Sequence, residues 1–107
     1  ASTKEKAYLA SMKSDLRNLA TAQEGFFADN QVYRTGTANN LAGVAAPDAL
    51  LGNFTPSAGV TITYTATAGT GWSGHTVHTA TARTCDIFVG IAGPVGAATV
   101  EGEPKCT

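Results

Sequence analysis

The spacing of apolar residues in the first quarter of the chain constrains the fold more than any other feature of the sequence. Intervals of three and four separate the main apolar side chains, which are Leu9, Met12, Leu16, Leu19 and Phe26, with Gln23 in phase and Phe27 beside them. This is the repeat of one face of an α-helix, so the pattern predicts a single amphipathic helix over residues 3–28. Ser2 with Glu5 fits a capping box at its start. The apolar face must be covered by the rest of the chain.

Residues 29–59 have a different composition and no sustained period. Gly, Asn and Pro interrupt them throughout, and Ala is frequent. We expect a long loop that drapes over the core, because loops of this length inside a small domain are seldom left free. A short helical turn is predicted at 47–51, with Pro47 in its first position.

From Val60 onwards the apolar period becomes two, which is the signature of half-buried strands. Threonines alternate with apolar residues over 60–67, a second strand is expected at 72–83, and the most apolar strand at 85–92 ends at Gly93-Pro94. Residues 97–101 form either a short fourth strand or an irregular edge. The prediction is one α+β domain over 1–107, with a helical region (1–28) packed on a sheet of three to four antiparallel strands (60–92).

Length and charge limit the classes of partner. The chain has 107 residues, enough for one domain, and its seven basic and eight acidic residues give a net charge of −1. A balance this close to zero excludes strong electrostatic binding to nucleic acid or to an anionic membrane. The uninterrupted apolar runs are also too short to cross a bilayer.

No set of residues has the spacing of a catalytic, cofactor or metal site, so we expect none of the three. His75 and His78 are three apart on a predicted strand and should point to opposite faces. Glu101, Glu103 and Asp86 offer too few oxygens for calcium and are interpreted as a solvated loop. The serines lack a nucleophile-elbow context, and the glycines form no phosphate-binding loop.

Two further patterns have simpler interpretations than a functional site. The aromatic residues Trp72, Phe26, Phe27 and Tyr33 would suit a ligand platform, but in a chain with eight aromatics we expect them to fill the core. Residues 53–55 match a glycosylation sequon, a short pattern with many chance matches.

Cys85 and Cys106 are the only cysteines, so one intrachain pairing is possible. A small domain gains most from such a bridge, and we expect a disulfide and an oxidising compartment. The alternative is a pair of buried free thiols.

The order of these parts resembles a known family. The segment AYLASMKSDLRNLATAQEGFF at 7–27 followed by ADNQVY at 28–33 is similar to the second half of the long N-terminal helix of bacterial type IV pilins and pseudopilins. The helix, the loop, the antiparallel sheet and the C-terminal cysteine pair follow the family's order. The resemblance is close over the first 33 residues and loose over the rest.

The resemblance implies a structural subunit. A hydrophobic half-helix, outside this sequence, would hold the protein in the bacterial inner membrane before assembly into an extracellular pilus. The partners would then be other copies of this chain, minor pilins and the inner-membrane assembly machinery. Residues 29–59 would be the αβ-loop and 85–106 the disulfide-bounded region. The helix and assembly face would be the residues Leu9, Met12, Leu16, Leu19, Phe26 and Phe27.

Several functions stay open at this point. A type IV pilin would serve adhesion, motility or DNA uptake, and a pseudopilin would serve a type II secretion system. A secreted soluble binding module, with 29–59 as its recognition surface, is the alternative of another class. The absence of a catalytic pattern argues against an enzyme.

Overall fold

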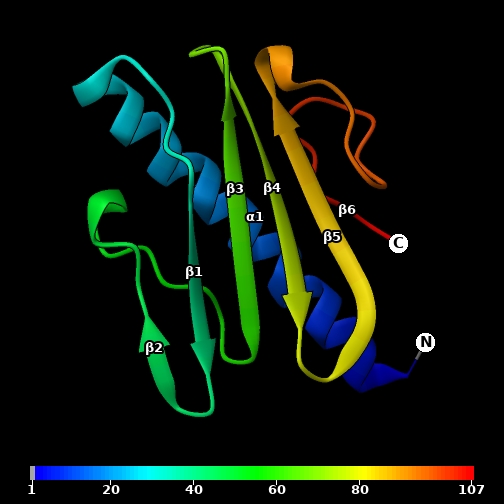
Figure 1. Ribbon diagram of the computed structural model, residues 1–107. Helices are drawn as coiled ribbons and strands as arrows, with labels where there is room; N and C mark the ends of the chain where they lie inside the picture. Colours follow the sequence, from blue (N-terminus) through cyan, green and yellow to red (C-terminus); the bar gives the residue numbers. More distant parts are fainter. Residues whose placement is uncertain (1) are drawn as a thin grey trace.

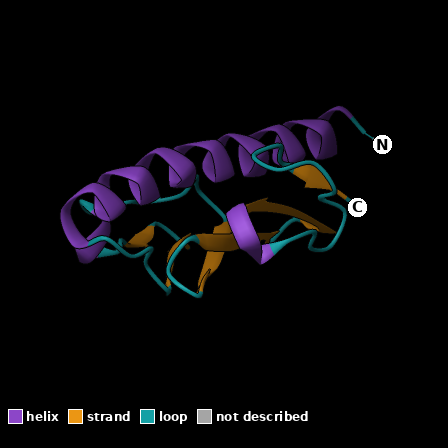
Figure 2. Cartoon of the chain, turned by 90° about the horizontal axis from the view of Figure 1, so that it is seen from above, coloured by secondary structure: helices purple, strands orange, loops and turns teal. Residues whose placement is uncertain are grey.

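The computed structural model describes residues 2–107 as one long helix lying across one face of an antiparallel sheet (Figures 1 and 2). This confirms the α+β class and the helix-on-sheet packing. The sheet has six strands rather than the three or four expected. Ala1 lies outside the described residues.

Helix α1 spans Thr3–Asn30 and runs the length of the domain. It begins where the Ser2 hydroxyl accepts a 3.0 Å hydrogen bond from the Glu5 N–H, which is one half of the predicted capping box. The Glu5 carboxylate instead accepts a hydrogen bond from the Thr81 hydroxyl. It ends because Gln31 adopts a left-handed conformation and donates its N–H to the Phe27 carbonyl. A helix of 28 residues is about 42 Å long, which matches the longest dimension of the domain, 41 Å.

The predicted apolar stripe is the buried face of α1. Leu9, Met12, Leu16 and Leu19 face the sheet, and Gln23 continues the line. The helix approaches closely at Gly74, where an added Cβ would lie 3.0 Å from Leu19 Cδ2. A larger residue at position 74 would therefore push the helix away from the sheet.

The strands follow one another in a nearly continuous meander. They are β1 (Gly36–Leu41), β2 (Val44–Ala46), β3 (Val60–Thr67), β4 (Gly71–His78), β5 (Thr81–Val89) and β6 (Lys105–Cys106), with short 3₁₀ turns η1 (Ala49–Leu51) and η2 (Gly90–Ala92). Their order across the sheet is β2-β1-β3-β4-β5-β6, and every neighbouring pair is antiparallel.

The alternation in β3 divides the sheet into two faces. Ile62 and Tyr64 are buried on the side of α1, whereas Thr63 and Thr65 point away from the helix and are exposed. The register carries this division to β4 and β5, where Gly74 and Ile87 lie on the helix side. The period-two pattern thus correctly predicted a half-buried strand.

Two predicted strands had wrong boundaries. The expected strand at 72–83 is interrupted by a reversal at Thr79 and Ala80, so β4 ends at His78 and β5 begins at Thr81. The expected strand at 85–92 ends at Val89 and is followed by η2. The reversal carries no Gly, Pro, Asn or Asp, so the sequence lacked a turn signal there.

The segment 29–59 is not wholly a loop. It contributes the hairpin β1–β2, whose register places Leu41 opposite Val44. The short helical turn expected at 47–51 is present as η1, which Asp48 caps. At the other end of the chain, residues 97–101 form no strand and the edge strand is β6 instead.

Candidate functional surfaces

The apolar residues expected to form a helix or assembly face divide between two environments. Leu9, Met12, Leu16 and Leu19 are covered by the domain's own sheet. Phe26 and Phe27 are half-buried, and Phe27 packs against Tyr33 with ring centroids 4.6 Å apart. The exposed side of α1 is therefore the opposite one, where the side chains are small, polar or charged.

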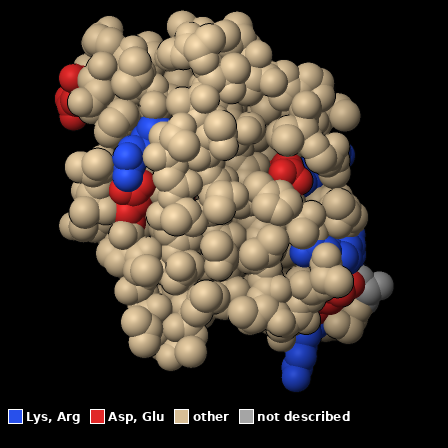
Figure 3. Space-filling model, viewed as in Figure 1, with Lys and Arg blue, Asp and Glu red and all other residues tan. Residues whose placement is uncertain are grey.

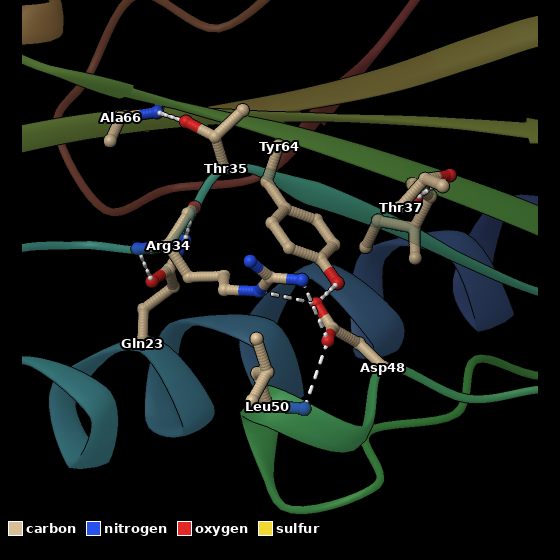
Figure 4. Close-up of polar contacts among 9 residues, drawn as sticks. Gln23, Arg34, Thr35, Thr37, Asp48, Leu50, Tyr64 and Ala66 are labelled. Carbon is tan, nitrogen blue, oxygen red and sulfur yellow. Dashed lines mark hydrogen bonds and ion pairs between the residues drawn. The ribbon is translucent and has the colours of Figure 1, made fainter.

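A buried carboxylate holds the segment between α1 and β3 in place (Figure 4). Asp48 accepts hydrogen bonds from Arg34 Nε at 3.0 Å, from Arg34 Nη2 at 3.2 Å and from the Tyr64 hydroxyl at 2.5 Å. It also accepts from the Leu50 N–H, which starts η1. One side chain thus joins the approach to β1, the turn η1 and strand β3.

The electrostatics of this cluster keep Asp48 ionised. Burial opposes the charge, but the hydrogen bonds from Arg34, Tyr64 and the Leu50 N–H outweigh it and lower the pKa of the Asp48 carboxyl. Burial, together with the bond to Asp48, raises the pKa of the Tyr64 hydroxyl. Tyr64 therefore stays protonated and remains the donor.

Gln23 anchors the same segment to the helix. Its side-chain Nε2 donates to the Arg34 carbonyl and its Oε1 accepts from the Arg34 N–H, both at 2.8 Å. The backbone of Arg34 thereby supplies a partner for both the amide nitrogen and the amide oxygen of the fully buried Gln23 side chain. Buried polar groups in folded proteins generally have such partners. The sequence placed Gln23 on the apolar stripe without predicting this role.

A second buried carboxylate, which lies on α1, holds the segment that leads into β3. Asp15 is buried and accepts three hydrogen bonds from Ser57, two from its N–H and one of 2.8 Å from its hydroxyl. Burial raises the pKa of the Asp15 carboxyl even though the bonds from Ser57 lower it. Buried polar side chains thus tie residues 29–59 to α1 at Gln23 and at Asp15, in addition to the contacts of Tyr33 with Glu24 and Phe27.

The face of the sheet that points away from α1, called the outer face below, is rich in hydroxyl groups and poor in charge. Strands β1, β3 and β4 contain no Asp, Glu, Lys or Arg. Figure 3 shows charged side chains to either side of the uncharged area over these strands. One row across the sheet places Thr37, Thr63, His75 and Asp86 opposite one another.

The two histidines point to opposite faces, as predicted. His75 lies on the outer face, where its Nδ1 is 2.7 Å from Asp86 Oδ1. His78 lies at the helix side and stacks on Tyr8 with ring centroids 4.3 Å apart. They therefore contribute to no common site.

The acidic residues Glu101, Glu103 and Asp86, which could supply oxygen ligands to calcium, are dispersed. Glu101 accepts from the Gly90 N–H, Glu103 lies 3.7 Å from Lys105 Nζ, and Asp86 pairs with His75. Within residues 2–107 no group of three or more metal-ligating side chains comes together.

The C-terminal segment folds back over β5. Cys85 and Cys106 form the predicted disulfide and lie directly opposite each other in the β5–β6 register. Before β6, an added Cβ at Gly96 would collide with the Asp86 carboxylate, and the Gly102 N–H donates to the Phe88 carbonyl. This segment explains why Asp86 and Phe88 are buried on the outer face.

An open groove of about 320 Å³ lies between the C-terminal end of α1 and η1. Its walls include Ala22, Phe26, Asp29 and Leu51.

The aromatic residues expected in the core differ in burial. Trp72 is fully buried, so its expected role in the core is confirmed, whereas Phe26 is only half-buried. The sequon residue Asn53 is exposed beside η1.

Comparison with protein-family models, curated proteins and solved structures finds no match for this chain. Among the described residues, none of the helices has the length and hydropathy needed to cross a membrane.

Proposed function

We propose that this chain is the globular part of a filament subunit of the type IV pilin kind. The observation that carries the proposal is the relation of α1 to the sheet. A 28-residue helix spans the whole domain and buries one side against the sheet. Its other side stays open along the entire length, with small exposed residues such as Ala7, Ala10, Ser14 and Thr21. That side allows a helix of another copy to come close.

Two other features support the proposal. The loop between α1 and β3 is held by buried polar contacts through Asp48, Gln23 and Asp15, so it presents one fixed shape to a neighbour. The C-terminal segment is closed by the disulfide between Cys85 and Cys106. Repeating contacts between identical subunits need such fixed edges, because each contact must be formed in the same way.

The proposal is tested in the organism that encodes the chain. Antibodies raised against residues 1–107 should label filaments sheared from the cell surface, and deletion of the gene should remove that labelling while an unrelated surface antigen persists. Labelling of neither surface filaments nor a secretion pseudopilus would contradict the proposal.

The two alternatives give different results in the same experiment. A type II secretion pseudopilin would leave surface filaments intact and retain exported proteins in the cell envelope after gene deletion. A soluble binding module would appear in the culture medium as free protein. Residues 29–59, which contacts of Asp48, Gln23 and Asp15 hold in one shape, would be the recognition surface of such a module.

A further inference from the structure

The groove between the C-terminal end of α1 and η1 combines apolar walls with one acidic side chain. Leu51 belongs to the hydrophobic core and Phe26 packs against it, so both walls are held in place from within. Leu50 also lines the groove, although 64% of that residue is exposed. Asp29 is exposed and is the one ionisable residue among the described residues that line it. Such a groove suits a ligand with an apolar part and a cationic part.

The electrostatics at this end of α1 are negative and are not balanced by a nearby basic residue. From residue 18 to residue 82 the chain contains one basic residue, Arg34, and its guanidinium is bound by the buried Asp48. The last turn of α1 has no basic residue and contains Asp29. An acid at the C-terminal end of a helix adds to the negative potential of the helix dipole. A cation at the groove would therefore be favoured by both.

Gly25 keeps the helix side of the groove open. It lies inside α1, where glycine is unfavourable compared with any residue except proline. An added Cβ at this position would meet no described atom within 4 Å outside the adjacent helix backbone. No contact of residues 2–107 therefore requires glycine here, and a longer side chain would extend into the groove that Gly25 lines.

We infer that this groove binds a basic side chain of a partner protein, with the cationic group at Asp29 and an apolar side chain of the same partner segment on Leu50. A lysine or arginine side chain fits because its aliphatic stem packs on apolar walls while its charge stays at the solvated rim. The groove is open and cannot enclose a small free ligand, whereas a segment lying across it would also cover Leu50. The inference goes beyond the filament role and does not depend on it.

A second copy of this chain fits the groove less well. Within residues 2–107, the basic residues outside ion pairs are Lys4, Lys6, Lys13 and Arg17. All four lie on α1, and none of the large apolar residues that the described chain exposes is on that helix. A second copy would therefore bring a cation to Asp29 without an apolar side chain to cover Leu50.

Titration of the ¹⁵N-labelled domain with blocked peptides, followed by amide chemical shifts, tests the inference. The probe is acetyl-Leu-Lys-Leu-amide, and its matched control contains norleucine, which is lysine without the side-chain amino group. We expect saturable shifts at residues 25–30 and 50–52 at millimolar peptide. The lysine peptide should bind about fivefold more tightly than the norleucine peptide, because only its ammonium group gains from Asp29 and the helix dipole. High salt should reduce that difference.

Three variants separate the roles of charge and space. Asp29→Asn should weaken the lysine peptide about fivefold and leave the norleucine peptide unchanged. Gly25→Leu should fill the groove and weaken both peptides about tenfold or more. It should not lower the thermal midpoint, since leucine favours a helix more than glycine does, and this separates a filled groove from a misfolded domain. Glu103→Gln, the matched loss of one acid outside the groove, should bind both peptides normally.

The outcomes separate this inference from its alternatives. Absence of saturable shifts at residues 25–30 and 50–52, or equal affinity of the unmodified domain for the two peptides, would overturn it. Shifts of the same amides when the domain is diluted without peptide would show that a second copy occupies the groove, and would overturn it as well. The titration uses the isolated domain in solution, so a failure of the filament proposal leaves its result unchanged.

Discussion

Several contacts that hold residues 29–59 in place meet at Asp48. It is nearly fully buried and serves Arg34, Tyr64 and the Leu50 N–H at once. Removing a shared acceptor leaves several buried donors without a partner, which costs more than the loss of one bond.

Replacement of Asp48 should therefore cost more stability than replacement of Tyr64. We expect Asp48→Ala to lower the free energy of unfolding by about 3 kcal/mol, because Arg34 and the Tyr64 hydroxyl lose their partner. Tyr64→Phe removes one bond and should cost about 1 kcal/mol. Urea unfolding followed by circular dichroism measures both, and equal midpoints for the two variants would refute the ranking.

Asp15 and Asp48 should give the domain opposite responses to pH. The pKa of Asp15 is raised above its usual 3.8, so the folded state binds that proton more tightly than the unfolded state. Its contribution to stability is complete below pH 3.8 and is lost as pH rises through the raised pKa. The pKa of Asp48 is lowered, so its contribution is present above pH 3.8 and is lost as pH falls below that value.

The test uses isosteric amides. Relative to Asp15→Asn, the unmodified domain should lose stability as pH rises from 3.8 through the raised pKa of Asp15. Relative to Asp48→Asn, it should lose stability as pH falls below 3.8. Urea titrations across pH 3 to 7 give both differences, and a flat Asp15→Asn difference would contradict the raised pKa.

At the scale of elements, β6 depends on its disulfide more than on its own contacts. It contains two residues, pairs only with β5, and is preceded by a segment without regular structure. A strand this short does not hold its place by hydrogen bonds alone.

Cys106→Ser should release this end of the chain. The loop-entropy model gives a loss of about 3 kcal/mol for a loop of this size. Limited proteolysis should then cut within 93–107 while α1 stays intact, and unreduced wild-type protein should be two hydrogens lighter than its reduced form. Wild-type protein under reductant is the control and should match the variant. Equal resistance of the variant and the oxidised protein would contradict the prediction.

At the scale of the whole molecule, the large apolar side chains that residues 2–107 expose are scattered. The exposed large apolar residues lie on separate elements: Val32, Val44, Leu50, Val77, Ile91 and Val100. A lasting dimer in solution needs a larger continuous apolar area.

We therefore expect residues 1–107 to sediment as a monomer at micromolar concentration, with a compact shape of 13.1 Å Cα radius of gyration. Analytical ultracentrifugation at low and high salt measures this. A tight dimer at both salt concentrations would contradict this prediction.

The sequence alone determined the elements in which apolar residues recur at a regular interval. The intervals from Leu9 to Phe26 predicted α1, and the alternation from Val60 predicted β3, because each period corresponds to one backbone geometry. The cysteine pair predicted the disulfide, since two cysteines allow one bridge. These signals are local, so they need no knowledge of what the element packs against.

Only the tertiary structure decided the remaining features. The sequence of the hairpin β1–β2 has no regular apolar period. The hairpin forms because β1 pairs with the edge of β3, where Ala38 is buried opposite Ile62. The roles of Gln23 and Asp15 depend on Arg34 and Ser57, which lie 11 and 42 residues away along the chain. A polar residue on an apolar stripe carries no local sign of its partner, because the hydrogen bond that justifies its burial forms only when distant segments meet.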